Sequence, residues 1–291
     1  METANTAAAD LCLTPSAFAA LLGRPDTPLI LDVRHPERFA LSPSLLPSAM
    51  HVAPQVLADW LKDRPAQSAV VYCVYGHELS QNAAVQLRNA GWAARYLLGG
   101  IEGGEPGVDG SALIQALSAA PAPLIRKRPD LGVTGIGGSR WVTRAGPKID
   151  RVACPWLIRR FIDRDAAFFY VPADEVLAQT ALRQAVAFDI PGVPIAHEGE
   201  RCSFDALLGA FGLSLPALDL LAAIVRGADT DRLDLAPPAA GLLAVSLGMA
   251  RRHATDDRAM LEAMVPVYDA LYAWCLDQVD GNLEAHNWSP Q

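Results

Sequence analysis

Apolar and polar positions alternate between two periods in the first third of the chain. Mainly apolar runs of strand length occur at 28–33, 69–73 and 95–98. Segments with apolar residues at helical spacing lie around them, at 15–22, 55–61 and 80–90. Thr14 is an expected N-cap with Pro15 at the first helical position. Strands that alternate with helices predict an α/β fold with an open parallel sheet.

The pattern changes after residue 119, where a stretch rich in Pro, Gly and Arg shows no sustained period. We expect a first domain at 10–119, a linker at 120–139 and a second domain at 140–285. The second domain is predicted to be mainly α-helical with a little sheet. Strands are expected at 166–171 and 186–190, and helices at 155–162, 204–211, 216–226, 239–253 and 256–279.

The composition of the 291 residues is typical of a globular protein, since 51% are hydrophobic and 19% charged. No window has the uncharged apolar length of a membrane span, and the first residues lack the pattern of a signal peptide, so we expect a cytoplasmic protein without membrane partners. The formal net charge of −8 disfavours nucleic acid as a partner. Ten basic and three acidic residues between Arg126 and Arg164 nevertheless make a local region that attracts anions.

The five cysteines are odd in number, widely spaced and never arranged as C-x-x-C. They are expected to be reduced thiols rather than a disulfide framework or a zinc finger. Cys73 has the most informative position, because it follows a buried strand and precedes a Gly-containing loop and a helix near Ser80. A thiol at the carboxyl end of a parallel strand and beside a helix N-terminus can act as a nucleophile or carry sulfur as a persulfide. The alternative is a small buried residue at the end of a strand.

Three ordered blocks, LILDVRHPERF, AVVYCVYGHELS and ARYLLGGIEG, resemble the rhodanese family over residues 10–119. The resemblance implies that Cys73 is the persulfide-forming cysteine. It also implies an anion-binding loop made of Val74, Tyr75, Gly76, His77, Glu78, Leu79 and Ser80.

The Cys73 loop departs from the usual sulfurtransferase pattern Cys-Arg-x-Gly-x-Arg-Ser, because it has no arginine and one additional residue. The additional length resembles the arsenate-reductase and phosphatase-like branch of the superfamily, although that branch also uses an arginine. His77 is either a titratable group near the thiol or a solvated loop residue. Glu78 is expected to point away from a bound anion.

Two candidate sites lie in the second domain. Cys154 before Pro155 resembles an N-cap and first helical residue, which would put a second thiol near an anion pocket of Arg151, Arg159 and Arg160. The alternative is that these arginines pair with neighbouring aspartates on a solvated face. A metal ion in this domain is another option, with His197, Glu198 and Cys202 as ligands. Such a site would be completed by Asp229, Asp231, His253 or His286, whereas the alternative is a turn with solvated charges.

The segments IDRVACPWLIRRFID, IAHEGERCSFDALLGAFGL and GADTDRLDLAPPAAGLL resemble the C-terminal domain of ChrB-type chromate-resistance proteins over residues 140–280. The two resemblances together imply a sulfurtransferase fused to a chromate-resistance domain. Expected partners are a small sulfur donor or an oxyanion, such as thiosulfate or chromate, and a thiol or protein partner; no cofactor is required. The alternatives are a cysteine-based oxyanion reductase, with Cys154 or Cys202 as the resolving thiol, and a non-catalytic chromate sensor.

Overall fold

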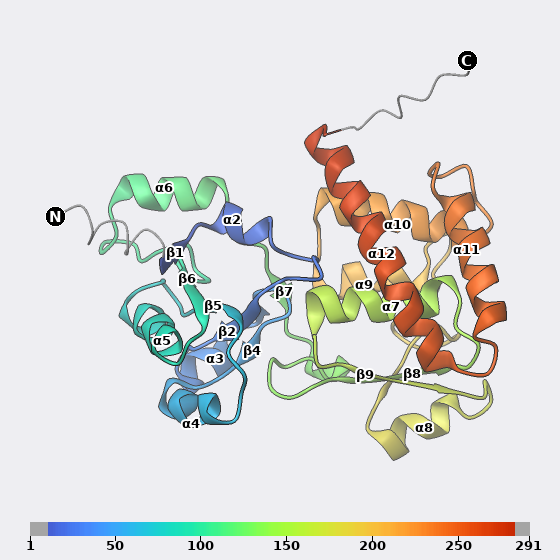
Figure 1. Ribbon diagram of the computed structural model, residues 1–291, viewed down its shortest axis with the longest axis horizontal. Coiled ribbons are helices and arrows are strands. Elements are labelled where there is room, and N and C mark those ends of the chain that lie inside the picture. The colour runs from blue at the N-terminus through green and yellow to red at the C-terminus, as the bar shows by residue number, and fades with distance from the viewer. Residues whose placement is uncertain (1–10, 283–291) are drawn as a thin grey trace. The chain divides into compact units, whose positions relative to one another are not determined.

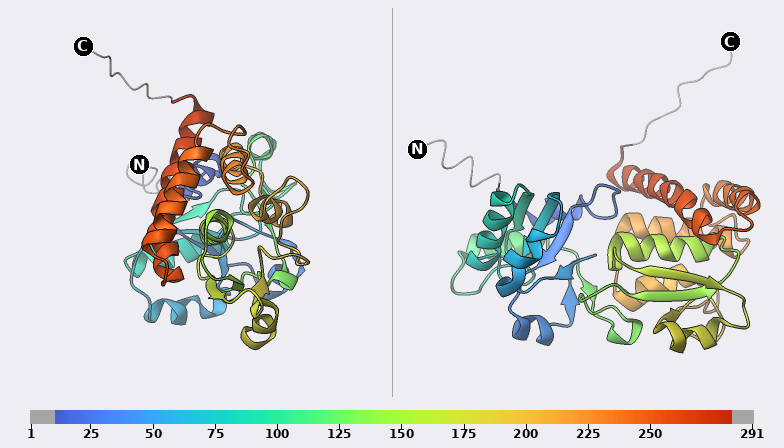
Figure 2. Two further views of the ribbon diagram at one scale, coloured as in Figure 1. Left: turned by 90° about the vertical axis from the view of Figure 1, so that its right-hand side faces the viewer. Right: turned by 60° about the horizontal axis from the view of Figure 1, so that its bottom comes forward.

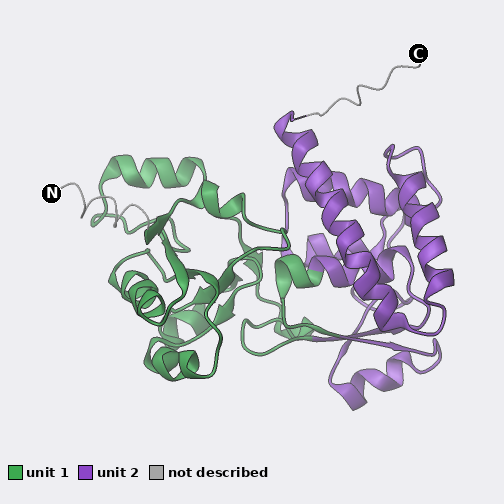
Figure 3. Cartoon of the chain, viewed as in Figure 1, with its two compact units in different colours: residues 1–139, 158–167 green, residues 140–157, 168–291 purple. Residues whose placement is uncertain are grey.

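The computed structural model describes residues 11–282, and contacts divide the chain into two compact units. Unit 1 comprises residues 1–139 and 158–167, and unit 2 comprises residues 140–157 and 168–291 (Figure 3). The chain therefore leaves unit 2 for ten residues and returns to it. Residues 120–139, where composition predicts a linker, belong to unit 1.

Unit 1 contains a five-stranded parallel sheet in the order β1-β6-β5-β2-β4 (Figure 1). β2 and, apart from Ser68, β5 are buried, because both faces of the sheet are covered there. The expected α/β architecture is confirmed, and the three predicted strands become β2, β5 and β6. The bounds are β1 Cys12–Leu13, β2 Leu29–Asp32, β4 Met50–His51, β5 Ser68–Tyr72 and β6 Ala93–Leu97.

Helices of unit 1 follow the strands as the periodicity predicts. Alternate residues of β2 and β5 pack with α4 (Leu57–Lys62) and α5 (Glu78–Asn89) in one apolar cluster. The Thr14 hydroxyl accepts a hydrogen bond from the Ala17 amide, so the predicted cap of α2 is confirmed. The other helical elements are α2 Pro15–Ala19, α3 Pro36–Leu41, η1 Pro54–Val56 and α6 Ser111–Ala119.

A buried ion pair fixes the end of β2 beside β5. Arg34 and Asp32 are 1% and 0% exposed, and their closest side-chain atoms lie 2.6 Å apart. The Tyr72 hydroxyl also donates a hydrogen bond to Asp32, at 2.8 Å. Since Tyr72 directly precedes Cys73, this network holds the carboxyl end of β5 in place.

The segment 120–139 adds a short antiparallel pair to unit 1. β7 (Ile125–Arg126) pairs with β3 (Ser44–Leu45), and the Lys127 amide donates to the Pro43 carbonyl at 2.7 Å. A single-turn helix, η2 (Pro129–Leu131), follows before the chain reaches β8.

Unit 2 places a three-stranded sheet, β10-β8-β9, between α8 and a group of longer helices (Figures 1 and 2). The expected strands are present, although β10 is shorter than predicted, and the expected helices are present apart from the one at 155–162. α8 (Val176–Arg183) packs against β8 through an apolar cluster that includes Val142 and Val176. The remaining bounds are β8 Arg140–Arg144, β9 Ala167–Val171, β10 Val186–Ala187, α7 Ile149–Leu157, α9 Ser203–Phe211, α10 Pro216–Asp229, α11 Ala239–Arg252 and α12 Asp257–Asp280.

The expected start of the helix at Pro155 is wrong, because α7 begins at Ile149 and contains Pro155 in its interior. Proline has no N–H for the carbonyl of Arg151, four residues earlier. The Tyr170 hydroxyl donates to that carbonyl instead, at 3.0 Å. α7 continues as a π-helical segment, η3 (Ile158–Ile162). None of the helices within residues 11–282 has the length and apolar character needed to cross a membrane.

Candidate functional site

Cys73 lies directly after β5, at the carboxyl end of the unit 1 sheet, and is 5% exposed. Its Sγ donates a hydrogen bond to Oγ of Ser80 at 3.2 Å, and that hydroxyl donates to the His77 carbonyl at 3.2 Å. Ser80 is not the N-cap of α5, because the helix begins at Glu78 and His77 holds the cap position. The first turn of α5 therefore folds the Ser80 hydroxyl back onto the thiol.

Two glycines allow the loop after Cys73 to pack against the turn that follows β6. Gly76 and Gly100 have φ values of +77° and +58°. A Cβ on Gly100 would lie 2.5 Å from the Gly76 nitrogen, and one on Gly76 would lie 2.7 Å from the Gly100 nitrogen. The amides of Ile101 and Glu102 donate to the carbonyls of Cys73 and Val74, each at 3.0 Å. This close contact of backbones fixes the shape of the loop.

The loop leaves a run of backbone donors next to the thiol. No acceptor among residues 11–282 takes the N–H groups of the five residues from Tyr75 to Leu79. The last two belong to the first turn of α5, where such groups are unpaired in any helix. Free amides at a loop and helix N-terminus suit an anion. The arrangement places a thiol next to backbone hydrogen-bond donors that suit an anion.

The acidic and titratable side chains of the loop are directed elsewhere. The His77 ring contacts Asp109 through Nε2 at 2.9 Å and Glu105 through Nδ1 at 3.4 Å, so neither ring nitrogen is bonded to Cys73. Glu78 is exposed, as expected from the repulsion of an anion. Leu79 packs against the apolar cluster of the sheet, and the Tyr75 ring lies 6.0 Å from that of His77.

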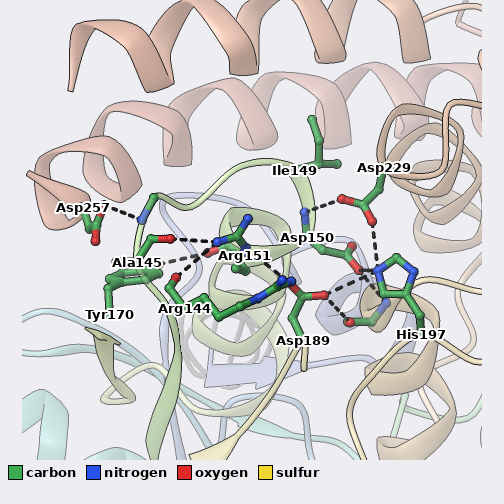
Figure 4. A network of polar contacts seen from close by, with 12 residues as sticks. Arg144, Ala145, Ile149, Asp150, Arg151, Tyr170, Asp189, His197, Asp229 and Asp257 are labelled. Atoms are coloured by element: carbon green, nitrogen blue, oxygen red, sulfur yellow. Dashed lines mark hydrogen bonds and ion pairs between the residues drawn. The ribbon is translucent and has the colours of Figure 1, made fainter. Parts of the chain in front are cut away.

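A second group of ionisable side chains gathers in unit 2 around His197 (Figure 4). Asp150 comes from the first turn of α7, Asp189 follows β10, and Asp229 ends α10. The His197 Nε2 atom lies 3.0 Å from Asp229 Oδ2, 3.4 Å from Asp150 Oδ2 and 3.4 Å from Asp189 Oδ1. Figure 4 shows the three carboxylates directed toward the imidazole ring.

The three carboxylates have different partners. Asp189 receives the Arg144 and Arg151 guanidinium groups, at 3.1 and 3.3 Å, and the Ser203 hydroxyl at 2.9 Å. Asp150 accepts the Ser203 backbone N–H through Oδ2, while its Oδ1 is buried with no hydrogen-bond partner among the described residues.

Burial and mutual repulsion shift the protonation of this group. Burial, with Asp150 close by, raises the pKa of Asp229 to about 7, and the same burial raises the pKa of Asp150. The hydrogen bond and charge of Asp150, with the nearby Asp229, raise the pKa of His197 to about 9. The carboxylates thus favour a positive charge at the position of the imidazole.

The structure separates the residues that the sequence suggested as metal ligands. His197 meets Asp229, one of the residues suggested to complete the site, but Glu198 is exposed. Cys202 is buried and its Sγ donates to Asp205 at 3.4 Å, as the cap of α9. Asp231 and His253 lie outside the group of three possible ligands formed by Asp150, His197 and Asp229. His286 lies outside the described residues.

The predicted anion pocket at a helix N-terminus does not form as expected. Cys154 lies in the interior of α7 and is fully buried, and burial raises the pKa of its thiol well above the ordinary value. Arg151 binds Asp189 and the carbonyls of Arg144 and Ala145. The other two arginines of the prediction, Arg159 and Arg160, are half-buried in η3, which belongs to unit 1.

Comparison with protein families identifies both parts of the chain. Residues 14–105 match the model of the rhodanese-like domain, and residues 141–275 match the model of the ChrB C-terminal domain. The chain joins a rhodanese-like domain to a ChrB C-terminal domain. Both expected resemblances are confirmed.

Protein ChrB of Cupriavidus metallidurans is similar over 136 residues, with 38% identity. The match covers 46% of this chain and 40% of that protein, so the chain spans less than half the length of the curated relative. Among solved structures, a rhodanese homolog of the extremely thermophilic bacterium Thermus thermophilus has 30% identity and a TM-score of 0.27, covering 31% of this chain and 97% of that one. A full-length protein from Lactobacillus plantarum has 20% identity and a TM-score of 0.33, covering 43% and 99%.

Sequence reasoning did not identify two aspartates of the cluster around His197. Asp150 and Asp189 lie 47 and 8 residues before His197 and share no short motif with it. The charge pattern favours a solvated face for Asp150, although the residue is 1% exposed. One signal in the sequence was available: Asp150 adjoins apolar residues at the start of a helix, which indicates burial. A buried carboxylate needs partners from other elements.

Proposed function

We propose that the rhodanese-like domain is a sulfurtransferase that forms a persulfide on Cys73, and that it acts in chromate tolerance together with the ChrB domain. The observation that supports this proposal is the position of the Cys73 thiol. It lies beside Ser80 and five backbone N–H groups that have no protein acceptor among the described residues. The role in chromate tolerance is carried over from the resemblance of the second domain to ChrB-type proteins.

The reaction transfers one sulfur atom in two balanced steps. The Cys73 thiolate attacks the outer sulfur of thiosulfate, the sulfur–sulfur bond of the donor breaks, and sulfite leaves with the bonding electron pair. A nucleophile such as cyanide then attacks the outer sulfur of the persulfide, which forms thiocyanate and regenerates the thiolate. The loop amides bind the sulfonate oxygens of the donor, and Ser80 can turn its hydroxyl toward the thiolate.

The absence of arginine from the loop bears on the choice of donor. Amide groups supply directed hydrogen bonds but no full positive charge, whereas an arginine supplies a bidentate, charged partner for an oxyanion. Glu78, exposed at the start of α5, adds a negative charge near the loop. We therefore expect weak binding of thiosulfate, seen as a high KM, with the chemical step still dependent on Cys73.

The test is thiosulfate:cyanide sulfurtransfer by the full chain and by two single-cysteine variants. Cys73→Ser should abolish thiocyanate formation. Cys12→Ser is the matched control, because Cys12 is a second thiol of unit 1 and lies on β1, the strand at the edge of the sheet beside β6. Equal rates for wild type and Cys73→Ser would refute the proposal. A loss of activity in Cys12→Ser, with activity kept in Cys73→Ser, would show that Cys12 and not Cys73 is the reactive thiol.

Burial disfavours an oxyanion reductase in which Cys154 or Cys202 resolves a disulfide with Cys73. Cys154 and Cys202 are both 0% exposed, and burial raises the pKa of both thiols, which makes them poor resolving nucleophiles. No observation on the described residues supplies another resolving thiol for Cys73.

A further inference from the structure

We propose that Asp150, His197 and Asp229 of the ChrB domain bind a divalent first-row transition-metal cation. The three residues come from α7, the loop after β10 and the end of α10, so the folded domain brings together ligands from three distant segments. The proposal is independent of the sulfurtransferase function assigned to Cys73.

The spacing of the ligand atoms suits a common metal ion. One ligand atom from each of the three residues lies within 4.8 Å of the other two. Nε2 of His197 lies 3.0 Å from the Asp229 carboxylate and 3.4 Å from the Asp150 carboxylate. Ligands about 2.1 Å from a metal lie about 3.0 Å apart at an octahedral edge and about 3.4 Å apart at a tetrahedral edge. Small movements would suffice to admit an ion.

The Asp150 carboxylate provides an independent indication of a missing ligand. The residue is 1% exposed, and its Oδ2 is engaged by the Ser203 amide. Its Oδ1 is buried and has no hydrogen-bond partner within residues 11–282. A buried carboxylate oxygen without a partner is costly, and a cation that the carboxylate binds through both oxygens removes that cost.

The two carboxylates of the proposed ligand set supply two negative charges to the ion. Asp189 is paired with the Arg144 and Arg151 guanidinium groups, which contact its Oδ2, and it therefore stays outside the proposed ligand set. Asp150 and Asp229 face a single imidazole. A divalent cation with two carboxylates and a neutral histidine forms a charge-balanced group.

The donor set and the access route restrict the ion further. One imidazole and two carboxylates favour divalent first-row transition metals such as Mn²⁺, Fe²⁺ or Zn²⁺ over Ca²⁺, which prefers oxygen ligands alone. His197 and Asp189 line an open pocket of about 330 Å³ together with Arg144, Ile190, Pro191 and Ala196. This pocket gives the ion a path from solvent and leaves room for water at the remaining coordination positions.

The experiment uses the full chain after dialysis against a chelator, titrated with Mn²⁺ by electron paramagnetic resonance and with Zn²⁺ by calorimetry. We expect one ion per chain with micromolar or tighter affinity. Asp150→Asn is nearly isosteric, and His197→Gln changes a side chain that is 42% exposed, so both variants should fold. Each should weaken binding by at least about tenfold, because Asp150→Asn removes a charged ligand and His197→Gln removes the imidazole nitrogen. Glu198→Gln, which changes the exposed neighbour of His197, should bind as the wild type does.

Three results would overturn the proposal. The wild type could fail to bind either ion up to millimolar concentration, which would leave the cluster as an ion-pair network with a protonated histidine. Asp150→Asn and His197→Gln, shown to be folded by circular dichroism, could keep wild-type affinity. Glu198→Gln could lose binding as strongly as they do, which would place the ion elsewhere.

Discussion

The Sγ atom of Cys73 donates a hydrogen bond to Oγ of Ser80 across the first turn of α5, at 3.2 Å. The Ser80 hydroxyl is fully buried and also contacts the His77 carbonyl, so its position is fixed by the loop. This contact makes Ser80 the side chain best placed to support a thiolate or a persulfide on Cys73.

Ser80→Ala should slow the reactions of Cys73 without unfolding the domain. The variant removes a hydroxyl that can donate to the thiolate, and the loss of one such hydrogen bond corresponds to roughly a tenfold lower rate. The measurement is the rate of Cys73 alkylation by iodoacetamide, followed by peptide mass spectrometry, with Cys12 alkylation in the same sample as the internal control. An unchanged ratio of the two rates would remove Ser80 from the chemistry.

Gly100→Ala should destabilise unit 1 far more than Gly103→Ala. Both glycines have positive φ, so an alanine at either position costs about 1–2 kcal/mol from the backbone alone. At Gly100 the new Cβ would also meet the Gly76 nitrogen at 2.5 Å, whereas at Gly103 nothing lies within 4 Å. Urea unfolding should show an additional loss of at least about 2 kcal/mol for Gly100→Ala. Equal losses would mean that the loop after Cys73 does not depend on this backbone contact.

Lys127 should make the stability of unit 1 rise with pH in the alkaline range. Its Nζ donates to the Phe39 carbonyl and lies over the Phe39 ring, and burial, with nearby Arg34, lowers its pKa from 10.5 to about 8. The unfolded chain therefore binds more protons between pH 8 and 10.5, so the free energy of unfolding increases as pH rises through that range.

Lys127→Met should remove this increase. The comparison is the free energy of unfolding of wild type and variant at several pH values, with Lys62→Met as a control, because Lys62 is 72% exposed. The wild type should gain stability relative to Lys127→Met between pH 8 and 10.5. A difference that stays constant or falls with pH would contradict the assignment.

Tyr170 and Pro155 should be energetically coupled through the Arg151 carbonyl. Tyr170→Phe removes the hydroxyl donor to that carbonyl and should cost about 1 kcal/mol in the wild type. In a Pro155→Ala background the new amide can donate to the same carbonyl, so the cost of Tyr170→Phe should be smaller. A double-mutant cycle on unfolding free energies measures the difference, and strict additivity would show that the tyrosine does not replace the missing helical hydrogen bond.

Local patterns were sufficient to predict most of the fold. The apolar run before Cys73 and the Thr14-Pro15 helix start are encoded in adjacent residues, and both appear in the structure. The start of α7 was misplaced because Pro155 is a strong local signal for a first helical turn. Its tolerance inside α7 depends on Tyr170, which arrives from β9 and is invisible to local reasoning.

The site in the ChrB domain was harder to predict for the same reason. His197 was identified as a candidate ligand, but its strongest partners come from segments up to 47 residues away in the sequence. The sequence pattern predicts neighbouring residues such as Glu198 as ligands instead. A loop residue next to a ligand, however, points to solvent as readily as to the ion. Burial of Asp150 and its contact with His197 are properties of the tertiary structure.

The most direct test of the central proposal is the intact mass of the full chain after exposure to thiosulfate and removal of the excess. We expect a gain of one sulfur atom per chain in the wild type and in Cys12→Ser, reversed by cyanide, and no gain in Cys73→Ser. Sulfur addition that persists in Cys73→Ser, or its absence from the wild type at saturating thiosulfate, would contradict persulfide formation on Cys73.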